Sequence, residues 1–502
     1  DIINRHCSTR AQVDHGTVAL VLILNRLTMP LPLYQIADWL AQTVLVYTLG
    51  MAATQFNDDR LARTLDAIQP HCRDIWEAVV QRALVQAEID LSIIFYDLTA
   101  FVVHGAYSGS QHVDFGFANN TPMNKRKFKI GLDVTADGHI PSDYKLWPGR
   151  TTDMATVQEN MERLRRLLKR RGLSRDEVLV VGDRANVDDK LALAYDDRNL
   201  RYLAGLRLLK KVHQKLVEDI LEKQFYAGQP LTDERGPRAY WGVPCQVPFQ
   251  PKNSKRKVTH RGLVVLSGPM RTALRQSRAA RLKELRQALM EVQSKLGQPY
   301  YRTVKSVQRK ANAKLNASPV GKFMRVKAYI DEQGQVCLHW WVASYPLWQA
   351  MQRDGRYLLV TNDWSLSPQQ MLALYHQKDG VEKRICVSKS QLKVSPIYLH
   401  KDERIEAMLL LNMLALLAYS VLERQARRGG LQMTTRRILE KLQNLDVVET
   451  NCWDGNRLLR PVPMDEEQAI LLDVLARVLA DLQIPRWPYP LLPAGNDFLL
   501  AL

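Results

Sequence analysis

The sequence predicts a mixed α/β protein, in which a central sheet is interrupted by a β-rich insertion and flanked by helical regions. Three observations lead to this prediction. Apolar residues recur at three- and four-residue spacing from Thr17 to about Ala87, which is the pattern of amphipathic helices. From Asp90 the pattern changes to short apolar runs bounded by turn residues, which indicates strands. Beyond Arg427 the pattern is helical again.

Composition indicates a globular protein with an anionic partner. The chain has 502 residues, of which 46% are apolar, so it can form several domains. Its formal net charge of +18 favours a nucleic acid, because neutralising phosphates releases condensed counterions. A basic protein without a nucleic-acid role is the alternative. The sequence has no Gly-rich phosphate loop, so we expect no nucleotide cofactor.

Cysteine usage and hydropathy bear on the compartment. The cysteines form no Cys-x-x-Cys pair, which argues against a zinc site or a disulfide framework and for a reducing cytoplasm. No signal-peptide pattern opens the sequence, and the most apolar run, Val18 to Leu24, is far too short to span a bilayer. We therefore expect a cytoplasmic protein without a membrane role. The six cysteines are Cys7, Cys72, Cys245, Cys337, Cys386 and Cys452.

The N-terminal helical pattern breaks at Met29-Pro30-Leu31-Pro32. Two helices around this turn could form a helix-turn-helix that binds DNA, and plain bundle packing is the alternative.

The central sheet is expected to follow in a defined order of strands and helices. We expect strands at 92–99, 112–117, 128–134 and 144–147, a helix at 154–171, a strand at 177–182, a helix at 188–195 and a strand at 201–206. Strands one to three, helix, strand four, helix, strand five is the order of the RNase H-like fold.

Two acids interrupt the apolar strands. The run around Asp97 is apolar on both alternating faces, and a buried unpaired carboxylate is costly, so this acid needs a compensating partner. A second apolar run ends at Asp183. If the two strands are neighbours, the acids meet at the edge of the sheet. Like charges held together imply a cation, and ligands that are all oxygen favour Mg²⁺ or Mn²⁺ over zinc.

A third acid lies on a helix expected to begin at Ser367. On a continuous helix, Tyr375, Lys378, Glu382 and Lys389 fall within roughly 60° of one another, so one face carries a metal-ligand type among phosphate-ligand types. A solvated helix face is the alternative. The acids that compete for the metal-binding role are Asp133, Asp188, Asp189 and Asp379.

The sheet pattern is interrupted from about 208 to 354. Strands are expected at 262–267, 323–330 and 336–344, around a basic helix. The arginines of this helix share an arc of roughly 140°, which suits a phosphate backbone, and a solvated face is the alternative. They are Arg271, Arg275, Arg278, Arg281 and Arg286.

These residues carry a family resemblance. The chain resembles bacterial insertion-sequence transposases of the DDE type, and more narrowly the superfamily with a Tyr-Arg-Glu-Lys signature. The resemblance runs from about Leu20 to about Leu422, and two positions depart from the pattern: Lys378 replaces Arg, and Arg150 replaces Asn. The motifs that carry it are Tyr375-x2-Lys378-x3-Glu382-x6-Lys389, Tyr96-Asp97-Leu98-Thr99, Val181-Gly182-Asp183-Arg184, Asp137-Gly138-His139-Ile140-Pro141, Trp147-Pro148-Gly149-Arg150-Thr151-Thr152-Asp153 and Asp402-Glu403-Arg404-Ile405.

The resemblance implies a division of labour along the chain. It implies a helical N-terminal region at 1–89 that helps recognise DNA ends, an RNase H-like catalytic core at 90–207 and 355–428, and an insertion domain at 208–354. A helical C-terminal region at 429–502 could support dimerisation. Asp97, Asp183 and Glu382 would hold two Mg²⁺ or Mn²⁺ ions roughly 3.5 to 4 Å apart. The residues expected to bind DNA are Tyr375, Lys378, Lys389, Arg271, Arg275 and Arg278.

The function implied by the resemblance is that of a DNA transposase. It would bind the terminal repeats of an insertion sequence, cleave double-stranded DNA and join the freed end to target DNA, with a homodimer holding two ends together. One alternative is a metal-dependent nuclease of the same fold that cuts without joining. The other is a DNA-binding derivative that has lost catalysis.

Overall fold

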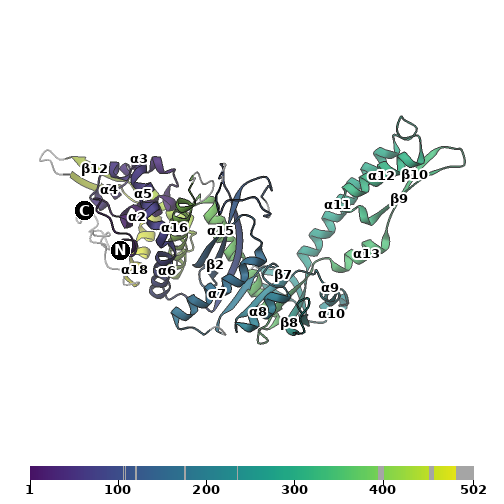
Figure 1. Ribbon diagram of the computed structural model, residues 1–502, viewed down its shortest axis with the longest axis horizontal. Coiled ribbons are helices and arrows are strands. Elements are labelled where there is room, and N and C mark those ends of the chain that lie inside the picture. The colour runs from purple at the N-terminus through teal and green to yellow at the C-terminus, as the bar shows by residue number, and fades with distance from the viewer. Residues whose placement is uncertain are drawn as a thin grey trace. The chain divides into compact units, whose positions relative to one another are not determined.

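The computed structural model describes residues 1–481, except for 106, 108, 119–120, 175–176, 234–235, 394–398, 400 and 452–456. Cys452 therefore lies outside the described residues. The chain forms two compact units. The first comprises 1–183, 197–201 and 377–502, and the second comprises 184–196 and 202–376. Figure 1 labels their helices and strands.

The first unit contains the strands that carry the two predicted strand acids. β1 pairs with β2 in antiparallel fashion and with β4 in parallel fashion, and the strand order is β3-β2-β1-β4. The bounds are β1 (Ile93–Val102), β2 (Lys127–Thr135), β3 (Pro141–Pro148) and β4 (Leu179–Gly182). The mixed α/β fold with an RNase H-like core is thus confirmed. The strand expected at 112–117 is wrong, because that segment makes an isolated bridge between Asp114 and Lys127.

Helices cover both faces of these strands. α7 (Asp153–Arg171) lies on the face of Tyr96, whose hydroxyl donates a hydrogen bond to Thr156 Oγ1 at 2.7 Å. α15 (Asp379–Ser390) packs against β1 and β2, and Figure 1 shows this green helix beside β2. Successive side chains of a strand point to opposite faces, so Asp97 lies on the face opposite to Tyr96. The sheet therefore separates a structural face from the face that carries the candidate acids.

α16 (Asp402–Arg428) is the central helix of the first unit. It contacts helices that precede the sheet in sequence and helices that follow it, so the two terminal regions share one core. α16 is long and apolar enough to cross a membrane, but 78% of its apolar window is buried within the protein. The helices that α16 contacts are α2 (His15–Thr28), α5 (Asp58–Ile68), α6 (Cys72–Gln86), α17 (Thr435–Gln443) and α18 (Glu466–Asp481).

Short elements complete the first unit. The predicted break after α2 is present, because α2 and the following 33–41 segment meet at 96°. A hairpin at β12 (Val447–Asn451) and β13 (Arg457–Pro461) lies where the sequence suggested only helices. The other short elements are α1 (Ile2–His6), η1 (Leu33–Gln35), α3 (Ile36–Ala41), α4 (Leu45–Leu49), η2 (Ala53–Phe56) and η3 (Gln69–His71).

The second unit is built on five strands in the order β5-β11-β8-β7-β6. β11 pairs in antiparallel fashion with β5 on one side and with β8 on the other, so strands of the insertion extend the sheet. The strands are β5 (Arg201–Leu206), β6 (Leu231–Asp233), β7 (Gly236–Phe249), β8 (Val258–Ser267) and β11 (Arg356–Thr361). The helices beside them are α8 (Asp189–Asp197), α9 (Lys211–Glu218), α10 (Glu222–Tyr226) and α14 (Pro368–Gln377).

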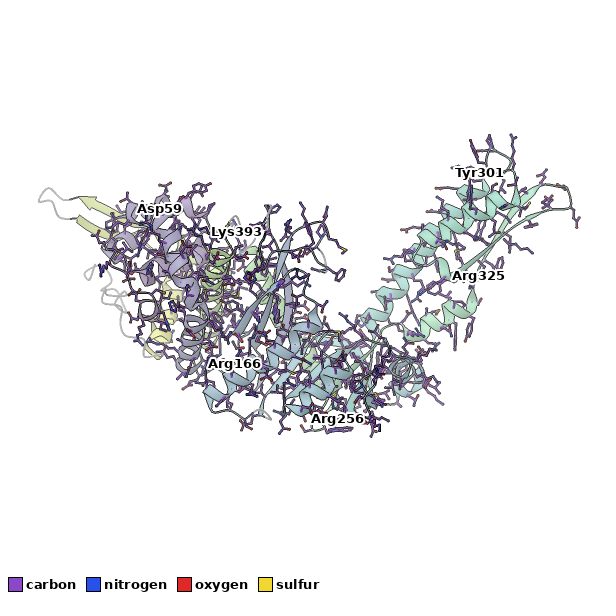
Figure 2. The ribbon with its side chains drawn as sticks, in the orientation of Figure 1. Asp59, Arg166, Arg256, Tyr301, Arg325 and Lys393 are labelled. Atoms are coloured by element: carbon purple, nitrogen blue, oxygen red, sulfur yellow. The ribbon has the colours of Figure 1, made fainter. Side chains whose placement is uncertain are left out.

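The rest of the insertion has an apolar core of its own. Buried side chains of two helices and a hairpin, including Leu289, Val307 and Leu338, form one cluster. Figure 2 labels Tyr301 and Arg325 in this part, where Lys310 Nζ lies 3.8 Å from the centroid of the Tyr301 ring. The elements are α11 (Gly268–Gln293), α12 (Val304–Ala317), η5 (Gly321–Phe323), β9 (Met324–Ile330), β10 (Val336–Val342) and α13 (Ser344–Arg353).

Candidate active site

The register of β1 and β4 places two of the predicted acids side by side. Tyr96 pairs with Gly182 in the parallel ladder, so the next residues along each strand are Asp97 and Asp183. The parallel pairing needed for this arrangement was assumed from the sequence, and the structure provides it. Asp183 follows the last residue of β4, and its side chain is 49% exposed.

The third acid is delivered by α15, but the helix differs from the one expected. The sequence predicted one continuous helix through Tyr375, Lys378, Glu382 and Lys389. The chain instead forms two helices, with Lys378 between the end of α14 and the start of α15. The predicted continuous helix is therefore wrong at Lys378. Tyr375 lies on α14 in the second unit, where a Cβ added to Gly205 would come within 2.8 Å of its hydroxyl.

Lys378 connects two of the acids. Its Nζ lies 3.0 Å from Glu382 Oε1 and 3.7 Å from Asp183 Oδ1, while its own side chain is only 10% exposed. Burial alone would lower the pKa of Lys378, but the charges of the neighbouring carboxylates outweigh it and the pKa is raised. The ammonium therefore stays charged and neutralises part of the acidic cluster.

Asp97 is the most strongly perturbed acid of the cluster. Its pKa is raised to about 7, chiefly by burial and also by the negative charges of Asp183 and Glu382. The charge of Lys378 and the backbone N–H of Leu98 oppose this rise. A carboxyl with such a pKa gains from a nearby cation, because only a positive charge offsets the cost of ionising it in a desolvated position.

Lys389 lies further along the same face of β1. Its Nζ donates a hydrogen bond to Thr99 Oγ1 at 2.7 Å and lies 5.1 Å from the centroid of the Phe101 ring. Asp97, Thr99 and Phe101 alternate along the strand and so share one face. Burial lowers the pKa of Lys389, although the charge of Asp97 partly offsets this effect. Thr99 is a site residue that period-two spacing from Asp97 could have identified.

The position of α15 depends on a close contact that requires glycine. A Cβ added to Gly380 would lie 2.2 Å from the ring of His139, so the ring occupies the place of a side chain. Burial lowers the pKa of His139 to about 4, and the nearby charge of Arg384 lowers it further. Arg384 Nε donates a hydrogen bond to the His139 carbonyl at 3.0 Å, and Nη1 donates to Glu423 Oε2 at 2.6 Å. These contacts fix the helix that carries Glu382 and Lys389.

The competing acids have other partners. Asp133 pairs with Tyr96 across the ladder, so it lies on the face opposite to Asp97, and it accepts a hydrogen bond from Asn160 Nδ2 at 2.9 Å. Asp188 accepts the backbone N–H of Leu191 at 2.8 Å. The remaining competitors also have structural placements: Asp189 accepts the backbone N–H of Gln250 and pairs with Lys210, and Asp379 lies in the first turn of α15.

The predicted basic stripe is engaged in ion pairs at the start of α11. Arg271 Nη1 lies 2.7 Å from Glu222 Oε1. Arg278 binds both carboxylate oxygens of Asp354, which is buried, and Arg275 Nε lies 3.5 Å from the same carboxylate. The predicted DNA-binding residues Arg271, Arg275 and Arg278 thus hold the insertion together, whereas Arg281 and Arg286 are exposed. The acidic partners of these arginines lie roughly 50 to 80 positions away in sequence. The local spacing of residues therefore cannot reveal these ion pairs.

The donor set of the site suits a hard divalent ion. Asp97, Asp183 and Glu382 offer oxygen ligands only, and the single buried ammonium balances only part of their charge. In the described part of the chain, a single group of three His, Cys, Asp or Glu side chains has its ligand atoms within 4.8 Å of one another, and it does not include these acids.

Comparison with known sequences assigns most of the chain. A family model described as a transposase DDE domain matches residues 89–418, and one described as a domain of unknown function (DUF4277) matches residues 1–79. No curated protein matches the sequence. The transposase match includes both strand acids and the α15 helix.

Solved structures of transposases are similar to parts of this chain at low identity. The cryo-EM structure of the piggyBac transposase synaptic complex with hairpin DNA has 10% identity over 86% of this chain and 71% of that chain, with a TM-score of 0.41. The Mos1 transposase paired-end complex with the left transposon end has 13% identity over 42% of this chain, with a TM-score of 0.16. This chain spans 63% of the Mos1 chain. Because this structural similarity is weak, the family assignment rests on the match to the transposase DDE domain model.

Proposed function

The chain belongs to the transposase DDE domain family, and on that premise we propose that it cuts the ends of its own mobile element and joins them to target DNA. The observation that carries this proposal is the clustering of Asp97, Asp183 and Glu382 around Lys378. These three acids come from segments up to 285 residues apart. A purely structural role would not require three acids beside one cation, two of them half exposed.

Asp97, Asp183 and Glu382 are the residues that would hold two Mg²⁺ or Mn²⁺ ions. Such ions, when bound, activate a water or a 3′-hydroxyl and stabilise the leaving oxygen of an in-line displacement at phosphorus. Of the three acids, Asp97 is the most desolvated and is fixed on the sheet, whereas Asp183 and Glu382 are half exposed at the surface from which DNA would approach.

The basic side chains have a positioning role in this proposal. Lys389 is held by Thr99 beside Asp97, which places a cation where a DNA phosphate would lie next to the acids. Lys378 keeps the acidic cluster from repelling the phosphate backbone.

We further propose that the partners are double-stranded DNA of the element's terminal repeats and of the target, with two copies of the chain holding two ends. The net charge of +18 supports an extended contact with phosphates. A bacterial, Tyr-Arg-Glu-Lys type of element and a cytoplasmic location beside the nucleoid are part of the same proposal. The five cysteines in the described residues are free thiols, which supports a reducing compartment.

The decisive experiment is cleavage of a labelled duplex taken from the DNA that flanks the coding sequence. We expect nicking at the element boundary with Mg²⁺ and none with EDTA. Glu382→Gln should abolish nicking while DNA binding survives, because the amide keeps the size of the side chain but not its charge. Glu403→Gln, an exposed glutamate at the start of α16, is the matched control and should cut normally.

Two outcomes would change the assignment. Equal cutting by Glu382→Gln and the parent protein would remove Glu382 from the site. Cutting without any product that joins a freed 3′-hydroxyl to a second duplex would favour a nuclease over a transposase.

A further inference from the structure

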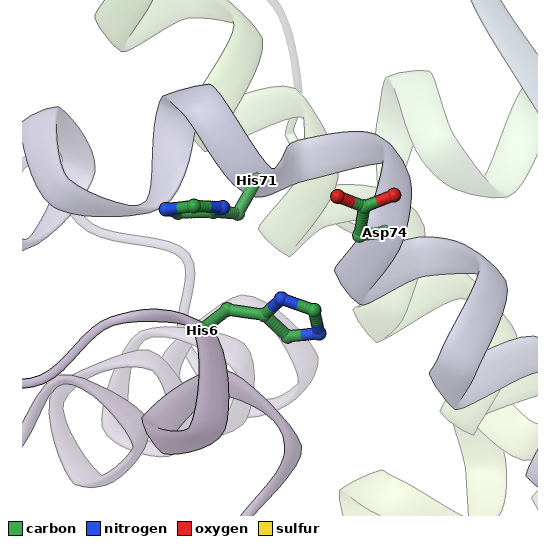
Figure 3. Close-up of side chains that lie close together, drawn as sticks. All are labelled: His6, His71 and Asp74. Atoms are coloured by element: carbon green, nitrogen blue, oxygen red, sulfur yellow. The ribbon is translucent and has the colours of Figure 1, made fainter.

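A second cluster of metal-ligand side chains lies in the first unit, on the helices that precede the sheet. His6 ends α1, His71 ends η3, and Asp74 lies in the first turn of α6. One ligand atom from each of these residues lies within 4.8 Å of the other two. Figure 3 shows His6 across from the helical segment that carries His71 and Asp74.

Within the part of the chain that the structure describes, a tilted contact between the two histidine rings is the interaction found among these side chains. Among the described residues, no hydrogen bond or ion pair engages the ring nitrogens of His6 and His71 or the carboxylate of Asp74. The two rings lie 5.7 Å apart between centroids and are tilted by 37°, so they are not stacked face to face. Polar atoms that converge without bonding one another leave room for a shared ligand.

Spacing and chemistry identify the class of ligand. His71 and Asp74 are three residues apart at the start of a helix, which puts them on one side, and His6 approaches from another segment. In a tetrahedral zinc site, bonds of about 2.0–2.2 Å place two ligand atoms roughly 3.4 Å apart. The ligand atoms of this cluster, all within 4.8 Å of one another, would move closer together by side-chain rotation as an ion binds. Two imidazoles and one carboxylate suit Zn²⁺ better than Mg²⁺, which prefers oxygen ligands.

We propose that His6, His71 and Asp74 bind one Zn²⁺ ion, with a water completing the tetrahedron, and that this ion fastens α1 to the start of α6. α1 has five residues, too few to be a stable helix alone, so it depends on such contacts. The site is separate from the catalytic acids in both position and ligand type. It gives the N-terminal helical region a metal dependence that the transposase activity does not require.

The test measures Zn²⁺ binding by the full chain, prepared without a histidine tag and with Asp97→Asn and Glu382→Gln so that the catalytic acids do not compete. Titration against a chromophoric chelator should show one tightly bound equivalent. His71→Ala and Asp74→Asn should each lose it, whereas His104→Ala, an exposed histidine outside the cluster, should keep it. Zn²⁺ should also raise the melting temperature of the protein in which His6, His71 and Asp74 are intact, and it should not raise that of His71→Ala.

Replacement of Zn²⁺ by Co²⁺ distinguishes this set of nitrogen and oxygen ligands from a site with thiolate ligands. Absorption bands of a tetrahedral nitrogen and oxygen site are expected, without a thiolate charge-transfer band. Such a band, or loss of binding in Cys72→Ser with retention in His71→Ala, would assign the metal to cysteine and overturn the proposal. The proposal would also be overturned if His71→Ala and Asp74→Asn both still bound one equivalent of Zn²⁺. Far-UV circular dichroism without Zn²⁺ checks that each variant is folded.

Discussion

At the scale of single residues, Lys378 decides the electrostatics of the candidate site. It is the buried cation between Asp183 and Glu382, and its charge is the main influence that opposes the raised pKa of Asp97. An ammonium in this position plays the part of a counterion while no divalent ion is bound. The same group must then compete with a divalent ion for the carboxylate oxygens.

This competition predicts the behaviour of Lys378→Met. Without divalent ions the variant should melt at a lower temperature than the parent, because two carboxylates lose their counterion. Addition of Mg²⁺ should raise its melting temperature by more than that of the parent, because the ion no longer displaces an ammonium. The measurement is thermal unfolding with and without Mg²⁺. Lys383→Met, which removes the same charge from an exposed position on α15, is the control. An equal Mg²⁺ shift in all three proteins would contradict this role.

At the scale of elements, the placement of α15 depends on the contact between Gly380 and His139. Glycine inside a helix costs roughly 1 kcal/mol relative to alanine, so its presence calls for a reason. The reason is steric, because the ring of His139 fills the space that a Cβ would need. The turn that carries His139 is in turn tied to α15 and α16 through Arg384 and Glu423.

Gly380→Ala should therefore displace α15 and with it Glu382. We expect DNA cleavage to fall by at least about tenfold, since a shift of roughly 1 Å at a reacting group has effects of this size or larger. DNA binding should change less. His139→Ala combined with Gly380→Ala should recover part of the lost rate, because the smaller side chain makes room for the new methyl group. Ser390→Ala at the end of the same helix serves as control. A Gly380→Ala protein with full activity would show that the helix can shift freely.

The arginines of α11 predict a second contrast at the element scale. Arg278→Ala leaves the buried Asp354 carboxylate without its bidentate partner and should cost about 3–5 kcal/mol of stability. Arg281→Ala, three residues further along the same helix but exposed, should change stability by less than about 0.5 kcal/mol. Urea unfolding measures both. Similar unfolding free energies for the two variants would show that the Asp354 pair contributes little to the fold.

At the scale of the first unit, α16 joins segments from both ends of the sequence. Its contacts with α2, α5 and α6 on one side and with α17 and α18 on the other make the helical regions parts of one core. Arg424 adds polar ties, because it donates to Asp137 and to the carbonyl of Ala87. The N-terminal region is therefore a structural part of the unit that carries the site, whatever its contribution to DNA recognition.

A chain that begins at residue 90 should consequently be unable to fold normally. Removal of α2, α5 and α6 uncovers apolar residues of α16 that are fully buried in the intact protein, such as Leu410 and Ala415. We expect an insoluble product, or a soluble one that binds a hydrophobic dye strongly. A chain ending at residue 481 retains all of these helices and provides the comparison. A soluble truncated protein with normal melting and no dye binding would contradict the shared core.

The sequence by itself determined the class of fold, most elements of the catalytic sheet and the identity of the clustered acids. The strand 201–206 was predicted with the bounds that the structure has, because it is a short apolar run between clear turn signals. Asp97 and Asp183 could be identified because an acid is energetically out of place at the end of a buried strand. These are local signals, which residue spacing alone can carry.

Only the tertiary structure decided how distant segments meet. The break at Lys378, the seat of Gly380 against His139 and the pairing of Arg278 with Asp354 all depend on residues far apart in sequence. The approach of His6 to His71 and Asp74 was equally invisible, since His6 and His71 are 65 positions apart. The physical reason is that periodicity reports which face of an element is apolar, whereas a contact depends on the partner against which that face packs.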